Sequence, residues 1–133
     1  LSLHRFRPSD SEAVQRWHDR MQPFVLLFID GGSCIDNRED RWDVIVAMLE
    51  LEGRASVAGF ATLYSFQQMV GRPRLRLSQV VVLPPFQRRG LGTAQLACAA
   101  VRVASLRARL APGMLPSVSA DSHSRFCAAG LTR

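Results

Sequence analysis

The sequence contains no lysine, so arginine alone supplies its 17 basic residues, which outnumber the 11 acidic ones and give a net charge of +6. Without lysine, the phosphate-binding loop G-x-x-x-x-G-K-[ST] cannot occur, and the Rossmann fingerprint G-x-G-x-x-G is also absent. No apolar run approaches the roughly 18 residues of a membrane-spanning helix. The N-terminus also lacks the basic-then-apolar pattern of a secretory signal. These absences exclude two common nucleotide-binding motifs and give no indication of membrane insertion or secretion.

Cysteine and histidine are sparse. Each occurs three times, and they form neither a C-x-x-C pair nor any recognised metal-ligand spacing. We therefore expect no metal site. An odd number of widely spaced cysteines favours reduced thiols in a reducing compartment. The residues concerned are Cys34, Cys98, Cys127, His4, His18 and His123.

The 133 residues match the length of one ordinary domain, and 47% of them are hydrophobic and 21% charged, which is close to the soluble average. We expect a single domain over residues 1–133. Because the chain starts with Leu1 in place of methionine, we expect a piece of a longer polypeptide, truncated at both ends, or an incomplete gene model. The basic balance suits an anionic partner such as nucleic acid, a phosphate or an acidic protein, or else a solvated basic surface.

Hydrophobic periodicity predicts both helices and strands. Apolar residues at spacings of three and four predict an amphipathic helix that begins near Pro8–Glu12 and ends before Pro23. The apolar run Phe24–Ile29 is consistent with a buried strand or a short helix. Turn residues then separate a hairpin, a further strand and a long helix, which together predict a mixed α/β fold. The expected strands are Trp42–Leu51, Ala55–Phe66, Arg76–Leu83 and Leu115–Ser119, and the later helices are Gly90–Arg109 and Ser122–Ala129.

The segment Gln87–Gly92 connects the expected strand Arg76–Leu83 to the long helix. Its glycines allow a ligand to approach the backbone closely. The unpaired N–H groups and the positive dipole end of the helix suit an anion, and Arg88 and Arg89 add positive charge. The segment therefore predicts a phosphate cradle, with a tight strand-to-helix connection as the plainer alternative.

The residues Q-R-R-G-L-G of Gln87–Gly92 resemble the [QR]-x-x-G-x-[GA] pyrophosphate loop of GNAT-superfamily acetyltransferases, which bind acetyl-CoA. The flanking residues are similar to the catalytic subunit of type B histone acetyltransferases, in which R-P-R, S-Q and L-P-P-F-Q surround the same loop. The similarity covers about Phe24–Arg125, most of the chain. The matching segments are Arg72–Arg74, Ser78–Gln79 and Leu83–Gln87 beside the loop, and Phe28–Asp30, Ser33–Asp36, Asp40–Trp42 and Thr62–Phe66 upstream.

The resemblance implies a GNAT acetyltransferase fold, an α/β (α+β) arrangement in which a mixed, mainly antiparallel sheet is flanked by helices. It implies acetyl-CoA as the co-substrate and no metal. The backbone of Val80, Val81 and Val82 would bind the acetyl and pantetheine groups, and Ser124 would add a cofactor contact. The pyrophosphate loop would comprise Gln87, Arg88, Arg89, Gly90, Leu91, Gly92 and Thr93, and the substrate groove Tyr64, Ser65, Phe66 and Trp42, the last being also a core candidate.

Two carboxylates stand at the family's catalytic positions. Asp30 occupies the place of a glutamate, and Ser119–Ser122 is similar to T-A-E-D, which puts Asp121 at the proposed general base and Ser122 at the neighbouring acid. A lysine amine with a pKa of roughly 10.4 must lose a proton before it attacks a thioester. A carboxylate can accept that proton directly or through water. Both aspartates are one methylene shorter than glutamate, and His123 is an alternative base.

The resemblance implies a histone acetyltransferase that modifies lysines of free core-histone tails, in the cytoplasm and the nucleus, with a WD-repeat histone chaperone as partner. Alternatives with the same fold are acetylation of another protein or of a small amine, and an inactive, truncated fragment. A basic nucleic-acid-binding module is disfavoured, because no aromatic-rich RNA-binding strand occurs and the basic residues do not cluster on one helix face. We accordingly expect Arg102, Arg107 and Arg109 to form a solvated helix face.

Overall fold

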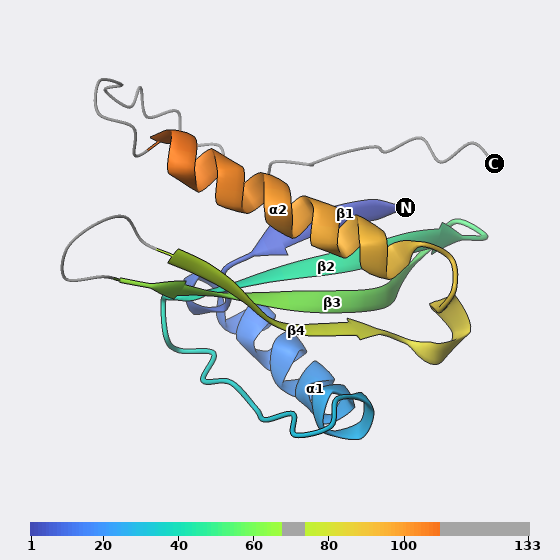
Figure 1. The fold of residues 1–133 in the computed structure, drawn as a ribbon. Helices are drawn as coiled ribbons and strands as arrows, with labels where there is room; N and C mark the ends of the chain where they lie inside the picture. Colours follow the sequence, from blue (N-terminus) through green and yellow to red (C-terminus); the bar gives the residue numbers. More distant parts are fainter. Residues whose placement is uncertain (68–73, 110–133) are drawn as a thin grey trace.

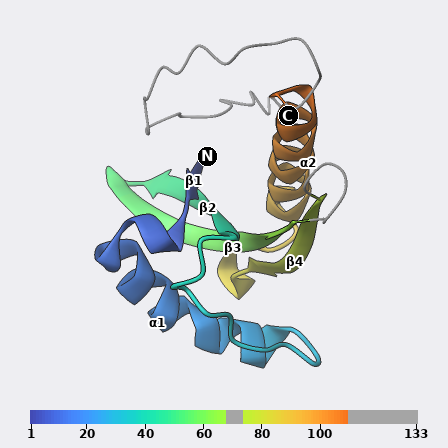
Figure 2. The same ribbon diagram turned by 90° about the vertical axis from the view of Figure 1, so that its left-hand side faces the viewer.

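The computed structural model describes residues 1–67 and 74–109. Its centre is one antiparallel sheet with the strand order β1-β2-β3-β4. Helix α1 covers one face of the sheet and helix α2 covers the other (Figure 1). Figure 2 shows the same three layers from the side. The elements are β1 (Ser2–Phe6), η1 (Pro8–Asp10), α1 (Glu12–Phe28), β2 (Trp42–Leu51), β3 (Arg54–Phe66), β4 (Arg74–Val82), η2 (Pro84–Phe86) and α2 (Leu91–Arg109).

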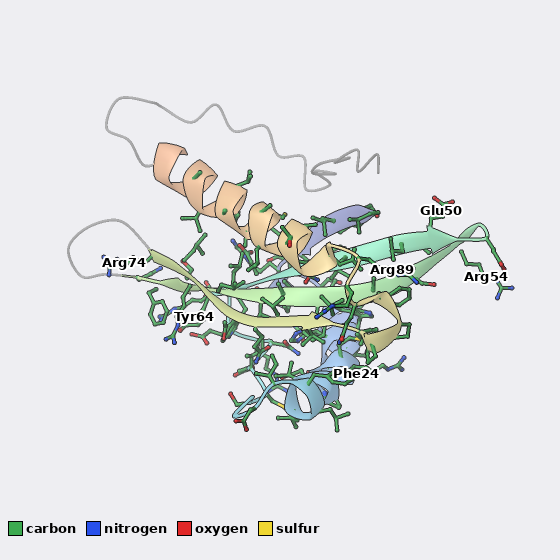
Figure 3. All side chains as sticks on the ribbon, turned by 45° about the vertical axis from the view of Figure 1, so that its right-hand side comes forward. Phe24, Glu50, Arg54, Tyr64, Arg74 and Arg89 are labelled. Atoms are coloured by element: carbon green, nitrogen blue, oxygen red, sulfur yellow. The ribbon has the colours of Figure 1, made fainter. Side chains whose placement is uncertain are left out.

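The expected fold class, a mainly antiparallel sheet flanked by helices, is confirmed. The predicted hairpin is strands β2 and β3, and its two-residue turn places Glu52 and Gly53 at φ 50° and 74°. Two consecutive left-handed residues match the twist of the flanking strands. Glu50 and Arg54 mark this end of the hairpin in Figure 3. The expected strand and helix at residues 115–119 and 122–129 lie outside the described residues.

Side-chain alternation along the strands builds a separate core on each face of the sheet, because successive strand residues point to opposite faces. On the α1 face, Val25 of the helix is fully buried against β2 and β3. On the α2 face, Ala99 of the helix packs on the neighbouring positions of the same strands. The buried strand residues are Val44, Val46, Phe60 and Val81 on the first face, and Leu3, Ile45, Ala47, Ala61 and Leu63 on the second.

Helix α1 passes through Pro23 and ends only at Phe28, so the prediction that it stops before Pro23 is wrong. Proline removes one helical hydrogen bond and crowds the preceding turn, a cost of about 3 kcal/mol in a helix interior. Packing of the residues that follow Pro23 offsets this cost. Val25 is fully buried, and the rings of Phe24 and Phe28 stack with centroids 6.1 Å apart. The run Phe24–Ile29 is therefore helical as far as Phe28, not a strand.

Strand β1 is absent from the sequence-based prediction. Its five residues pair with β2 from Ser2 opposite Met48 to Phe6 opposite Val44, and only Leu3 among them is buried. A short edge strand with one buried side chain has no clear period-two pattern. Its position is set by the partner strand, which no local sequence signal encodes.

Asp43 is a buried carboxylate at the start of β2 that joins three elements through arginines. Arg5 approaches it at 3.2 Å, Arg102 at 3.4 Å and Arg7 at 3.9 Å. Arg102 thus points from α2 toward the sheet, and the expectation that it belongs to a solvated face is wrong. The side chains of Arg107 and Arg109 lie outside the described ones.

Within residues 1–67 and 74–109, no helix is long and apolar enough to cross a membrane.

Candidate functional site

The loop between β4 and α2 has an unusual backbone. Arg88 and Gly90 both adopt left-handed conformations, with φ 63° and 76°. For a non-glycine residue such as Arg88 this costs roughly 1 kcal/mol. Left-handed residues within a turn are one way in which main-chain N–H groups are gathered into an anion-binding concavity. The loop therefore keeps a strained conformation that ordinary strand-to-helix connections do not need.

A hollow of about 330 Å³ opens over this loop. The first turn of α2 borders it, and the helical hydrogen bonds begin with Ala94 N donating to Gly90 O at 3.0 Å. The N–H groups ahead of that bond have no partner within the helix. An added Cβ on Gly92 would meet only Val82, at 3.9 Å, so the backbone there stays open to a ligand. The lining residues are Val82, Gln87, Arg88, Gly90, Leu91, Gly92 and Thr93.

Gln87 closes the loop with its side chain. Its amide nitrogen donates to the carbonyl oxygen of Val82 at 2.9 Å and so ties the loop to the end of β4. Arg88 and Arg89 are exposed beside it, free of this closure. Figure 3 shows Arg89 near the start of α2, toward the opposite end of the sheet from Tyr64. Within the proposed cofactor loop, Gln87 is thus a structural tie and the two arginines are the exposed cations.

The three valines of β4 divide between the two faces of the sheet. Val81 is buried in the α1-side core, while Val80 packs against the α2-side core and Val82 borders the hollow. Upstream, Ser78 is an extra residue between the pairs Leu77–Leu63 and Gln79–Thr62. A bulge of this kind bends a strand and re-aims its groups, and such bulges are over-represented beside active sites.

Gln95 is a fully buried residue of α2 that belongs to none of the sequence motifs. Neither atom of its side-chain amide has a hydrogen-bond partner in the described part of the chain. It lies against Gly59 of β3, where an added Cβ would stand 3.2 Å from the Gln95 amide nitrogen and 2.3 Å from Val81 O. A polar residue on the sheet-facing side of an amphipathic helix is the only sequence signal for this position.

Asp30 lies exposed on the turn that follows α1. The turn is tight, because Gly32 N donates to Ile29 O at 3.0 Å and a Cβ on Gly32 would fall 2.8 Å from Val25 O. Gly31 supports it with a left-handed φ of 67°. Beyond the turn, the Gln79 amide donates to Ser33 O at 2.7 Å. This hydrogen bond ties Ser33, which directly follows the Asp30 turn, to β4 at the residue before the proposed acetyl-binding segment Val80–Val82.

The proposed substrate residues form an aromatic row on the α1 face of the sheet. Tyr64 lies opposite Trp42 in the β2–β3 register, with ring centroids 4.6 Å apart, and its ring is 4.7 Å from that of Phe66. Trp42 is half-buried and its indole N–H has no partner among the described residues. The backbone N–H of Ser65 donates a hydrogen bond to Arg41 O at 2.9 Å.

Glu39 and Arg41 meet the hydroxyl group of Tyr64. The hydroxyl donates to Glu39 at 2.8 Å, and Arg41 donates to the hydroxyl oxygen at 3.4 Å. The hydrogen bond that Arg41 donates to Tyr64 raises the pKa of Arg41 above its ordinary value. Glu39 stands just outside the D-R-W segment Asp40–Trp42, so no sequence motif identifies it.

The loop that carries Asp36–Arg41 is fastened to α1 by buried polar side chains. Ile35 N donates to Gln22 at 2.6 Å, and His18 Nδ1 shares a 2.6 Å hydrogen bond with Asn37. Asn37 in turn donates to Asp19. Burial lowers the pKa of His18, against the opposing effects of Asn37 and Asp19. This network places the loop between the Asp30 turn and the aromatic row.

The remaining candidates fall outside the described residues. Asp121, Ser122 and Ser124 belong to the segment 110–133. Within residues 1–67 and 74–109, no three His, Cys, Asp or Glu side chains converge as metal ligands. Within the described residues, four candidate features are therefore arranged along one sheet. They are the hollow at Gln87–Thr93, the strand segment Val80–Val82, the Asp30 turn and the aromatic row.

Comparison with known proteins supports a single family. The sequence model of the acetyltransferase (GNAT) family matches residues 5–110. A histone acetyltransferase type B catalytic subunit of Cryptococcus neoformans is 43% identical over 86 residues, which are 59% of this chain and 20% of that protein. The corresponding protein of Yarrowia lipolytica is 35% identical over 114 residues, 68% of this chain and 24% of that protein. The chain thus spans about a fifth to a quarter of these curated relatives, to which it is similar.

Proposed function

Because the chain belongs to the acetyltransferase (GNAT) family, we propose that it transfers the acetyl group of acetyl-CoA to lysine side chains of free core-histone tails. The observation that carries this proposal is the succession of β4, the left-handed loop at Arg88 and Gly90 and the open first turn of α2. A hollow of about 330 Å³ lies over that succession. This succession offers main-chain N–H donors and the exposed guanidinium groups of Arg88 and Arg89. At Gly92 no side chain obstructs access to the backbone.

The residues present suit acetyl-CoA. Its pyrophosphate is anionic, and the N-terminus of a helix and arginine side chains both stabilise anions. Arg88 and Arg89 would bind it together with the N–H groups of Leu91 and Gly92. The backbone of Val80–Val82 would orient the acetyl and pantetheine groups. In this arrangement Gln87 acts indirectly, because its amide already binds Val82 O.

The reaction needs a base and an oxyanion donor. The acceptor nitrogen attacks the thioester carbonyl carbon, the carbon–sulfur bond breaks with its electron pair leaving on the sulfur of CoA, and the amine proton leaves to a base. Asp30 is our candidate within the described residues, directly or through one water, because Ser33, which directly follows its turn, is hydrogen-bonded to Gln79 of β4. Asp121, with Ser122 as its neighbour, remains a second candidate on the family motif. A main-chain N–H of β4 would stabilise the negative oxygen that forms at the attacked carbon.

The aromatic row suits an extended peptide that presents a lysine. Tyr64 and Phe66 offer apolar ring surface on the face that carries the Asp30 turn, and Glu39 adds a carboxylate beside the Tyr64 hydroxyl. A carboxylate there would attract a basic tail segment. The printed names of the similar proteins, histone acetyltransferase type B catalytic subunit, support the histone tail over other acceptors.

The same similarity supports a place for this activity in the cell. We propose that the protein acts in the cytoplasm and the nucleus on newly available histones, with a WD-repeat histone chaperone as partner. The experiment for the partner is co-purification of the full-length gene product with such a chaperone, compared with an unrelated WD-repeat protein.

Turnover of radiolabelled acetyl-CoA tests the function directly. The acceptors to compare are a core-histone tail peptide, the same peptide with its lysines replaced by arginine, and a small polyamine. The proposal expects label only in the lysine-containing peptide. Label in the polyamine alone would indicate a small-amine acetyltransferase, and no label in any acceptor, with cofactor bound, would indicate an inactive domain. In Asp30→Asn the rate should fall by roughly two orders of magnitude and recover as the pH rises and the amine loses its proton unaided.

A further inference from the structure

Gln79 is a buried polar residue of β4 whose side chain bridges three parts of the chain. Its amide nitrogen donates to Ser33 O at 2.7 Å, and its amide oxygen accepts a hydrogen bond from Thr62 Oγ1 of β3 at 3.3 Å. Gln79 is 7% exposed and Thr62 is fully buried. A buried amide that satisfies both of its ends in this way fixes its partners in place, because breaking either bond leaves a buried polar group unpaired.

The backbone of Gln79 occupies an equally constrained position. It is the first residue paired with β3 after the bulge at Ser78, and it directly precedes Val80. The strand segment proposed to orient the acetyl group therefore starts directly after Gln79, whose side chain binds Ser33. A single side chain thus connects the proposed cofactor strand to the residue that follows the turn of the proposed base.

The turn itself has little freedom apart from this bond. Gly32 is packed so closely against the end of α1 that a Cβ would lie 2.8 Å from Val25 O. On the far side of Ser33, the N–H of Ile35 is held by Gln22 at 2.6 Å. The side chains of Gln22 in α1 and Gln79 in β4 therefore both bind the backbone of the segment Ser33–Ile35. Of the two, only Gln79 belongs to the strand that would orient the acetyl group.

We propose that Gln79 is a positioning residue, which sets the distance between Asp30 and the acetyl group held on Val80–Val82. The inference rests on the proposed function, since it assigns Gln79 a role in the same reaction. Gln79 touches neither the acceptor nor the thioester and acts only through the Ser33 carbonyl. Misplacement of a catalytic group by about 1 Å can cost up to roughly a hundredfold in rate, so the bond to Ser33 is sufficient to affect turnover.

The test uses Gln79→Met, which keeps the length of the side chain and removes both hydrogen bonds, with Gln15→Met as the matched control on α1. Hydrogen exchange at residues 31–35 should become faster by about tenfold or more in Gln79→Met alone, because that bond no longer holds the turn. The kcat for the histone-tail peptide should fall about tenfold, while the KM for acetyl-CoA stays within about twofold. Gln79→Glu, which keeps an acceptor for Thr62 and loses the donor to Ser33, should show the same loss and serves if the Met variant does not fold.

A double variant separates positioning from a general structural effect. If Gln79 acts through Asp30, adding Gln79→Met to Asp30→Asn should lower kcat by less than about twofold further, because coupled residues are not additive. A full tenfold further loss, or unchanged exchange at residues 31–35 in both Gln79 variants, would overturn the inference. An absence of turnover in the parent chain would contradict the proposed function instead, and the exchange comparison would still decide whether Gln79 fastens the turn.

Discussion

The side-chain amide of Gln87 donates a 2.9 Å hydrogen bond to the carbonyl oxygen of Val82, five residues earlier in the chain. The bond folds the loop back onto the last residue of β4 and leaves Arg88 and Arg89 exposed at its tip. The amide group of Gln87 therefore serves to close the loop. The charge that would meet a pyrophosphate comes from the two arginines that follow.

Cofactor binding should depend on salt through these two arginines. In the double variant Arg88→Gly and Arg89→Ala, the glycine preserves the left-handed backbone at φ 63° while both charges are removed. We expect affinity for acetyl-CoA to fall about tenfold or more at low salt and its salt dependence to flatten, because exposed charges are screened by ions. Calorimetric titrations at two ionic strengths would measure this. Arg54→Ala, at the β2–β3 hairpin turn and outside the lining of the hollow, is the control, and equal salt slopes in the parent and the double variant would remove both arginines from the site.

Binding of the acceptor peptide should depend on the ring of Tyr64 more than on its hydroxyl group. Tyr64→Ala removes the ring that contacts Trp42 and Phe66, so the peptide KM should rise about tenfold, the usual scale for an aromatic anchor. Tyr64→Phe keeps the ring and loses only the contacts with Glu39 and Arg41, so its KM should change by less than about threefold. Steady-state kinetics with varied peptide would show it. Similar KM values in all three proteins would place the peptide elsewhere.

Acid should destabilise the fold through His18. Burial lowers the pKa of His18 in the folded chain, whereas the unfolded chain keeps a value of about 6.5. The unfolded state therefore binds more protons in the window below that value, and the stability contributed by neutral His18 is present above pH 6.5 and lost as the pH falls below it. Urea unfolding at pH 7.5 and 5.5 should show a smaller loss of stability in His18→Gln than in the parent. The exposed His4→Gln should behave like the parent, and an equal loss in all three would exclude His18.

Asp43 should contribute to stability far more than an exposed ion pair. Asp43→Asn keeps the volume and leaves Arg5, Arg7 and Arg102 without their shared carboxylate. Because the arginines are partly exposed, we expect a loss of about 2 kcal/mol, below the range for fully buried pairs. Glu12→Gln, which breaks the exposed pair with Arg16, should cost less than about 0.5 kcal/mol. Comparable denaturation midpoints for the two variants would contradict this account of the network.

The sequence predicts the elements whose signals are local. The hairpin, β4 and α2 follow from apolar periodicity and from turn residues such as Gly53, and the loop Gln87–Gly92 follows from its glycines and arginines. The continuation of α1 through Pro23 does not follow, because the burial of Val25 against the sheet outweighs a local helix breaker. Strand β1 has no strong pattern of its own and depends on pairing with β2.

The parts of the site that join distant segments could not be predicted for the same reason. Glu39 and Tyr64 are 25 positions apart, and Gln79 and Ser33 are 46 apart. No spacing rule relates such positions, since their contact depends on how the loop after α1 crosses the sheet. The orientation of Arg102 toward the sheet could not be predicted either, because its partner, the buried Asp43, is 59 positions away.

The most direct test of the central claim, that β4, the loop and the start of α2 bind acetyl-CoA, is a calorimetric titration of Gly90→Glu. The variant adds a side chain at a left-handed position, φ 76°, and a negative charge beside the hollow. Gly53→Glu imposes the same kind of backbone strain, at φ 74°, in the β2–β3 hairpin turn, which does not line the hollow. The account predicts that affinity for acetyl-CoA falls at least about tenfold in Gly90→Glu, through charge repulsion and the loss of backbone access, and is retained in Gly53→Glu. Parental affinity in a folded Gly90→Glu protein would contradict it.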